Sequence, residues 1–164
     1  MKKIILTALV LVGISFTSQA QEISENALGL RLGDNHGFGY ELSYQRKLSS
    51  DNRLELDLGL RNSNEVNGFK ITGVYQWVWN IEGGFNWYAG IGGGLGTWSW
   101  KYKDKDNNLY RSNETYAFVA GDLGIEYNFD FPLQIALDLR PELAFSDYND
   151  GINSDIALSL RYKF

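Results

Sequence analysis

The sequence predicts an all-β fold, an eight-stranded antiparallel β-barrel, and three observations predict it. Eight segments alternate apolar and polar residues with a period of two, which is the period of a β-strand. The connections between them switch between tight turns and longer polar stretches, as in a sheet that winds up and down. The last segment, residues 154–164, ends on Phe164 and has one wholly apolar face, formed by Ile156, Leu158, Leu160, Tyr162 and Phe164.

The first four strands are expected at residues 26–33, 37–47, 53–61 and 69–79. Each has leucine or aromatic residues on one face and charged or small residues on the other. In the third segment, for example, leucines occupy every second position, and Arg53, Glu55 and Asp57 lie between them. A helix cannot place such residues on two separate faces, so the pattern favours strands.

The last four strands are expected at residues 85–100, 114–129, 133–143 and 154–164. The fifth carries glycines at every second position of 90–96, and we interpret them as making room for Tyr88 and Tyr116 in a narrow interior. Their spacing is not that of a phosphate-binding loop, and no helical pattern follows them. Pro141 is expected in the outer half of the seventh strand, where a backbone donor is least needed.

The connections and the aromatic residues predict that this barrel crosses a membrane. Tight turns are expected at 48–52, 81–84 and 130–132, and longer polar loops at 62–68, 101–113 and 144–153, whereas Asp34–His36 is a short connection at the loop end. Nine aromatic residues fall at the level of the tight turns: Tyr44, Trp77, Trp79, Phe85, Trp87, Tyr127, Phe129, Tyr162 and Phe164. A belt of aromatic residues is typical of a membrane interface.

Residues 1–20 are predicted to be a cleavable signal peptide, and residues 21–164 the barrel domain. Lys2 and Lys3 precede an apolar run, Ile4–Phe16, that is too short to cross a bilayer as a helix. Small residues at Ser18 and Ala20 suit a cleavage site. A retained anchor helix is the less favoured alternative.

The charge and the composition exclude several classes of function. Twenty acidic and fifteen basic residues give a formal net charge of −5, and loss of Lys2 and Lys3 would make the chain more acidic. This charge argues against nucleic acid as a partner. The chain has no cysteine, which excludes disulfides and thiolate chemistry. Alternation alone leaves open a soluble barrel with reversed faces, apolar inside and polar outside.

The end of the chain resembles the assembly signal of bacterial outer-membrane β-barrels, with Phe164, Tyr162 two residues earlier, and apolar residues at alternate positions upstream. From Ala27 to Phe164 the chain resembles small eight-stranded outer-membrane proteins of the OmpX and OmpA-domain type. The stretches 88–96 and 120–129 look like the glycine-rich and Gly-x-Glu-Tyr strands of the "outer membrane protein beta-barrel domain" group.

This resemblance implies an integral protein of the outer membrane of a Gram-negative bacterium. The implied partners are outer-membrane lipid and lipopolysaccharide, with the barrel insertion machinery and periplasmic chaperones during assembly. We predict a monomer that binds no nucleic acid and no cofactor. The predicted function is a non-enzymatic role in envelope integrity or surface interaction. The alternatives are a small channel for ions or apolar solutes, and a barrel enzyme that modifies lipid A.

The enzyme alternative depends on His36, the only histidine, which is expected at the outer rim. A nucleophilic mechanism would also need a serine and an acid within reach, and the rim candidates are Ser63, Ser112, Ser146, Asp34 and Asp147. No local motif links these residues, so a solvated loop histidine is the better interpretation. We therefore predict no catalytic site.

A calcium-loop motif begins at Asp104 and Asp106 but is not completed. Leu109 occupies the position that requires glycine, and Thr115 occupies the position of the bidentate glutamate. We therefore predict a solvated loop and no metal site.

The polar faces are predicted to enclose a lumen filled by an interlocked charge network. The expected members are Arg31, Glu41, Arg53, Glu55, Asp57, Asp122, Glu126, Asp138, Arg140, Glu142, Asp155 and Arg161. Buried charges need partners, and arginine supplies several donors from one planar group. We expect Arg140 and Arg161 to be the hubs. Because eight strands enclose a space just wide enough for side chains, the barrel is predicted not to conduct.

Overall fold

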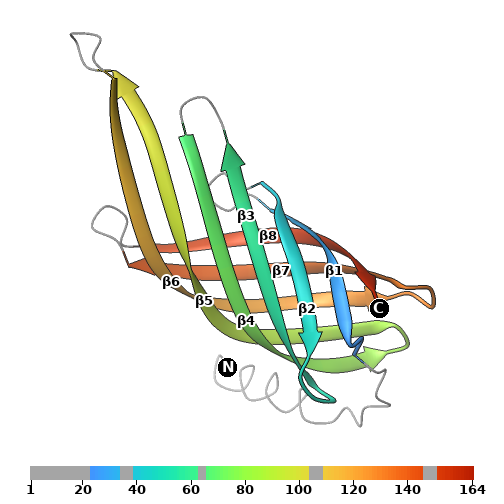
Figure 1. Ribbon diagram of the computed structural model, residues 1–164. Helices are drawn as coiled ribbons and strands as arrows, with labels where there is room; N and C mark the ends of the chain where they lie inside the picture. The colour runs from blue at the N-terminus through green and yellow to red at the C-terminus, as the bar shows by residue number, and fades with distance from the viewer. Residues whose placement is uncertain (1–22, 34–38, 63–65, 104–108, 146–150) are drawn as a thin grey trace, which may run out of the picture.

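The computed structural model describes residues 23–33, 39–62, 66–103, 109–145 and 151–164, which form a closed barrel of eight antiparallel strands (Figure 1). The strands are β1 (Asn26–Leu32), β2 (Glu41–Lys47), β3 (Asn52–Asn62), β4 (Val66–Glu82), β5 (Phe85–Lys103), β6 (Leu109–Asn128), β7 (Leu133–Phe145) and β8 (Gly151–Lys163). Each strand pairs with the next, and β8 pairs with β1. The predicted all-β, eight-stranded antiparallel barrel is therefore confirmed. Among the described residues, no helix has the length and apolar character needed to span a bilayer.

The two faces of the strands separate as the alternation predicts. Along β7, buried and exposed residues alternate without a break from Gln134 to Phe145. The buried residues point into the barrel and include Asp138 and Arg140, whereas Leu137 and Leu139 lie on the exposed outer surface. The reversed arrangement of a soluble barrel is therefore wrong for this chain.

Hydrogen bonds between the two ends of the described chain close the barrel. Leu28 on β1 lies opposite Tyr162 on β8, and the pairing runs on to Leu32 and Leu158. Beyond the last strand residue, the backbone N–H of Phe164 donates to the Asn26 carbonyl at 2.9 Å, and the Asn26 N–H donates back at 3.1 Å. The last residue of the sequence is thus part of the closing seam.

The end of the barrel at which the chain closes also has tight turns and packed aromatic rings. The β4–β5 turn contains Gly83 with a φ of 53°, a left-handed conformation that glycine adopts without steric cost. Next to it, the rings of Trp79 and Trp87 stack with centroids 4.3 Å apart, and those of Phe85 and Tyr127 are 4.6 Å apart. The aromatic level expected from the sequence therefore includes rings that touch across neighbouring strands.

At the opposite end, several strands extend further than predicted. The structure has strand at 66–68, 101–103, 109–113, 144–145 and 151–153, where the sequence was expected to form loops. The hairpin of β5 and β6 is the longest of these extensions and rises beyond the other strands (Figure 1). The apolar alternation that marks a strand depends on one face meeting an apolar medium, and it is lost where polar residues occur on both faces.

The connection from β1 to β2 is longer than the expected three-residue segment. β1 ends at Leu32 and β2 begins at Glu41, rather than at Gly37. Tyr40 is exposed and precedes the strand. Asp34, His36 and Phe38 lie outside the described residues.

Pro141 interrupts one hydrogen-bonded ladder inside the sheet, although it was expected where a donor is least needed. It pairs with Ser154 on β8, but on its other side the β6–β7 pairing passes from Ala120–Glu142 directly to Leu123–Leu139. Because proline has no N–H, it cannot complete the ladder toward β6. The ladder is therefore interrupted on the β6 side of β7, whereas pairing with β8 continues past Pro141.

The glycines of β5 and β6 make room for neighbours, as the sequence indicated. A Cβ on Gly96 would collide with the Tyr116 ring, and one on Gly92 would collide with the Gly73 backbone. On β6, a Cβ on Gly124 would occupy the position of the Tyr88 ring. Gly96 and Gly124 therefore leave space for the rings of Tyr116 and Tyr88, and Gly92 allows close approach of the β4 backbone.

Candidate functional site

The candidate site is the charged lumen of the barrel. Its charged residues are at most 4% exposed, and they comprise eight carboxylates and five cations. The carboxylates are Glu41, Glu55, Asp57, Asp122, Glu126, Asp138, Glu142 and Asp155, and the cations are Arg31, Arg53, Lys70, Arg140 and Arg161. The structure thus places every charged residue expected in the lumen on the inner wall. In the described part of the chain, no set of three or more metal-binding side chains is arranged to hold an ion.

Arg31 joins three strands through a single guanidinium group. Its Nη1 donates to Glu41 on β2 at 2.9 Å and to Asp155 on β8 at 2.7 Å. Its Nη2 donates to Asp138 on β7 at 2.5 Å, and Nε donates to the same carboxylate at 3.1 Å. This two-point contact is the geometry that makes arginine a strong partner for carboxylates.

Arg140 reaches across the lumen from β7 to β3. Its Nη2 donates to Glu55 at 2.8 Å, and its Nη1 donates to Asp57 at 2.7 Å. Asp122 on β6 lies 3.7 Å from Nε, and Glu41 lies 4.0 Å from Nη1. Arg140 is therefore a hub, and it links strands that are not neighbours in the sheet.

Arg161 was expected to be the second hub, but Arg31 has that position. The carboxylate that Arg161 meets is Glu55, at 3.1 Å, and Nε donates to the Ser43 hydroxyl at 3.0 Å. Acids were expected beside Arg161 on the adjacent strands, but it lies opposite Gly29 on β1 and Gln134 on β7. Its contact with Glu55 on β3 depends on how far the side chain reaches across the lumen.

A further layer of the network lies toward the tight turns. Arg53 Nη1 is 2.6 Å from Glu126, and Arg53 Nε donates to Gln76 at 2.5 Å. The guanidinium carbon also lies 4.7 Å above the centre of the Tyr88 ring. Cation–π contact with a desolvated ring adds to the ion pair.

Lys70 is a buried lumen charge that was not among the predicted members of the network. Its ammonium group lies 2.6 Å from Glu142 and 3.9 Å from Glu41, and 4.8 Å from the Phe118 ring centre. Its place between Phe69 and Ile71 on the polar face of β4 was the signal that could have identified it.

The residues predicted for the assembly signal and for the outer rim are not among the described members of the lumen network. Tyr162 and Phe164, the expected assembly signal, lie at the closing seam with ring centroids 6.2 Å apart. Ser112 is exposed on β6. The remaining rim candidates, His36, Ser63, Ser146, Asp34 and Asp147, lie outside the described residues, as do Asp104 and Asp106.

Two neighbouring carboxylates of β3 differ in their hydrogen bonding. Glu55 accepts hydrogen bonds from Arg140 and from the amides of Gln45 and Gln76, at 2.6–3.2 Å, and Arg161 Nη2 forms an ion pair with it at 3.1 Å. Asp57 accepts from Arg140 through Oδ2, and its Oδ1 has no hydrogen-bond partner among the described residues.

We therefore expect Glu55→Gln to lower the free energy of unfolding by about 3–5 kcal/mol, because it leaves two arginines short of a charge partner. Asp57→Asn should cost about 1–3 kcal/mol, because it weakens one contact of a group that is already half unpartnered. Urea unfolding in phospholipid vesicles, followed by tryptophan fluorescence, measures both. Equal losses would contradict the different roles of the two residues.

Comparison with solved structures identifies the fold. The chain is similar to the N-terminal β-barrel domain of Pseudomonas aeruginosa OprF, with a TM-score of 0.61 and 16% identity, over 86% of this chain and 98% of that one. It is also similar to Neisserial surface protein A (NspA), with a TM-score of 0.59 and 13% identity, over 85% and 94% of the two chains. The chain is similar as well to Ail, the attachment invasion locus protein of Yersinia pestis, with a TM-score of 0.51 and 16% identity, over 86% of this chain and 97% of that one.

These similarities confirm, at the level of the fold, the predicted resemblance to small eight-stranded outer-membrane barrels. No protein-family model matches the chain, and no curated protein matches it in sequence.

Proposed function

We propose that the protein is an integral, non-enzymatic β-barrel of the bacterial outer membrane that supports envelope integrity or a surface interaction. The observation that carries the proposal is the distribution of side chains: charges fill the interior, while leucines such as Leu56, Leu137 and Leu158 are 40–54% exposed on the outside. In water this arrangement would be unfavourable, since apolar surface would stay hydrated. In lipid it is the expected one.

The solved neighbours support this location. One is described as a surface protein and another as an attachment invasion locus protein, and both have the same barrel fold. By this proposal the tight turns and both chain ends face the periplasm, and the extended hairpin of β5 and β6 faces outward. An outward hairpin of this kind suits contact with other surface molecules.

The proposal is tested in cells and on the lipid. Fractionation should place the protein in the outer membrane, with heat-modifiable migration on gels, and a deletion strain should become more sensitive to detergents. The mass spectrum of its lipid A should be the same with and without the protein. A lipid A change that depends on the protein would instead support the enzyme alternative.

We expect the purified barrel not to conduct ions. The guanidinium groups of Arg31 and Arg140 reach into the lumen and donate to carboxylates of other strands. Phe118 fills the space next to Gly94 on β5, and Tyr88 lies against Gly124 on β6. Planar bilayers should therefore show no reproducible open level. Single-channel steps that disappear after heat unfolding would contradict the prediction and favour a channel.

Deletion of Phe164 should abolish assembly. The deletion removes the proposed terminal signal and also both backbone hydrogen bonds to Asn26. Phe164→Ala separates the two effects, because it keeps the backbone but loses the ring. We expect both variants to be depleted from the outer membrane and Phe164→Tyr to assemble normally. Normal assembly of Phe164→Ala would assign the defect to the seam rather than to a recognised aromatic residue.

A further inference from the structure

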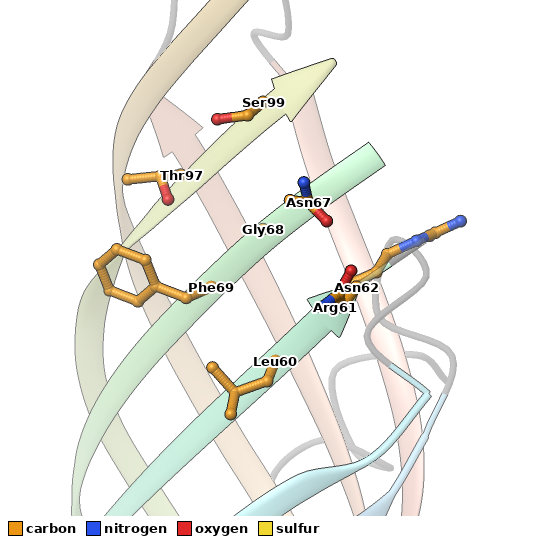
Figure 2. A pocket seen from close by; sticks show the side chains of 8 residues that line it. All are labelled: Leu60, Arg61, Asn62, Asn67, Gly68, Phe69, Thr97 and Ser99. Atoms are coloured by element: carbon orange, nitrogen blue, oxygen red, sulfur yellow. The ribbon is translucent and has the colours of Figure 1, made fainter. Parts of the chain in front are cut away.

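A groove of about 370 Å³ lies on the outer surface of the barrel, at the end away from the tight turns. Figure 2 shows that β3, β4 and β5 supply its walls. Two rows of side chains cross these strands. The row nearer the loop end of the barrel consists of Asn62, Asn67 and Ser99. The row nearer the middle of the barrel consists of Leu60, Phe69 and Thr97.

The groove marks the level at which the outer surface changes character. Below it, the outward-facing residues of the same strands are Leu58, Ile71 and Leu95, all of them exposed and apolar. In the row of the groove nearer the loops, the outward-facing residues are the amides Asn62 and Asn67 and the hydroxyl residue Ser99. By the proposed function, on which this inference rests, that level is the boundary between the acyl chains and the headgroups of the outer leaflet.

The polar groups of the groove are ready to bind. The Asn67 side-chain oxygen is buried, and it has no hydrogen-bond partner in the part of the chain that the structure describes. Thr97 and Ser99 stand on the adjacent strand and offer hydroxyls that both donate and accept. A buried polar atom without a partner is costly, and a ligand donor would remove that cost.

The chemistry of the lining distinguishes between headgroups. Arg61 contributes to the wall, but its guanidinium carbon lies 5.7 Å from the Trp98 ring centre and points away from the Phe69 side of the groove (Figure 2). The groove therefore presents neutral amide and hydroxyl groups beside the exposed ring of Phe69. This combination suits sugar hydroxyls with an apolar sugar face rather than a phosphate.

We propose that this groove binds the saccharide headgroup of one outer-leaflet glycolipid, with the acyl chains lying along Leu60 and Phe69. Asn67 accepts a hydrogen bond from a sugar hydroxyl, and Thr97 and Ser99 complete the contact from β5. Ser154 is an exposed, outward-facing serine that pairs with Pro141 on the opposite side of the barrel, and it is not part of the groove lining.

The test uses the full mature barrel, refolded into phosphatidylcholine nanodiscs that contain rough-type lipopolysaccharide. Native mass spectrometry then measures the glycolipid that remains bound. Asn67→Leu should raise the apparent Kd for the glycolipid about tenfold, which is the equivalent of one or two lost hydrogen bonds. Thr97→Val, which keeps the side-chain shape, should also raise it, and Ser154→Leu is the matched control.

Equal retention by the wild type, Asn67→Leu and Thr97→Val would overturn the proposal. Retention of phosphatidylglycerol with the same affinity as lipopolysaccharide would overturn the assignment to a saccharide. Heat-modifiable migration is measured first on each sample. A wild type that does not fold into bilayers would contradict the proposed function, whereas a wild type that folds without preferring the glycolipid would contradict the groove alone.

Discussion

Arg140→Met should lower the free energy of unfolding by about 3–5 kcal/mol, because it removes one partner of a buried ion-pair network. Methionine keeps the length of the side chain and fills most of the space, so the loss isolates the charge. Without Arg140, Asp57 loses the hydrogen bond to its Oδ2, and Glu55 loses one of its two arginines. Urea unfolding of the refolded protein in vesicles measures the change.

Arg46→Met is the matched control. Arg46 is exposed and donates to Asn26 at 2.8 Å near the tight turns. An exposed polar contact of this kind is worth about 1 kcal/mol or less, so the control should lose little. A loss at Arg140 no larger than that at Arg46 would show that the network contributes nothing to stability.

A double variant tests whether the cost comes from the unpaired acid. In Arg140→Met with Asp57→Asn, the carboxylate that the first change leaves uncompensated is neutralised. The loss of unfolding free energy in the double variant should then be smaller than the sum of the two single losses, by about 0.5–3 kcal/mol. Full additivity would mean that Asp57 and Arg140 act independently, despite their distance of 2.7 Å.

The sequence was sufficient to identify the faces of the strands but not the contacts across the lumen. Alternation placed Arg31 and Asp138 on the inner wall, because a strand has only two faces. Their contact spans two strands that are not adjacent, β1 and β7, and depends on the tilt and stagger of the barrel. No local pattern encodes that stagger, so Arg31 was not recognised as a hub.

The loop-end extensions of the strands could not be predicted from the sequence, for a different reason. Next to lipid, each outward position must be apolar, and this requirement leaves a pattern in the sequence. In the stretch 111–114 four polar residues, Arg111, Ser112, Asn113 and Glu114, follow one another, so no alternation marks this part of the strand, although it pairs with β5. The groove at Asn67 was missed for the same reason, since residues 62–68 looked like a loop.

Leu158→Arg should destabilise the barrel by about 2–4 kcal/mol, because it places a charge on the lipid face near the middle of the proposed membrane. Leu158 is 54% exposed and lies between Leu137 on β7 and Leu32 on β1. The same change at the next residue, Ser159, tests the opposite face. Ser159 is fully buried beside Arg31 and Ala136, so Ser159→Arg meets a packing conflict and a second cation instead of lipid.

The depth of the substituted residue in the membrane tests whether lipid causes the loss at Leu158. On the lipid face, the cost of arginine falls to about 0–1 kcal/mol near the interfaces, so Ser154→Arg, further out along the same strand, should be tolerated. Unfolding in vesicles compares Leu158→Arg, Ser154→Arg and the wild type. If arginine at Leu158 is tolerated as well as arginine at Ser154, lipid does not surround this part of β8. The apolar outer surface would then need a protein partner, because its leucines would otherwise remain in water.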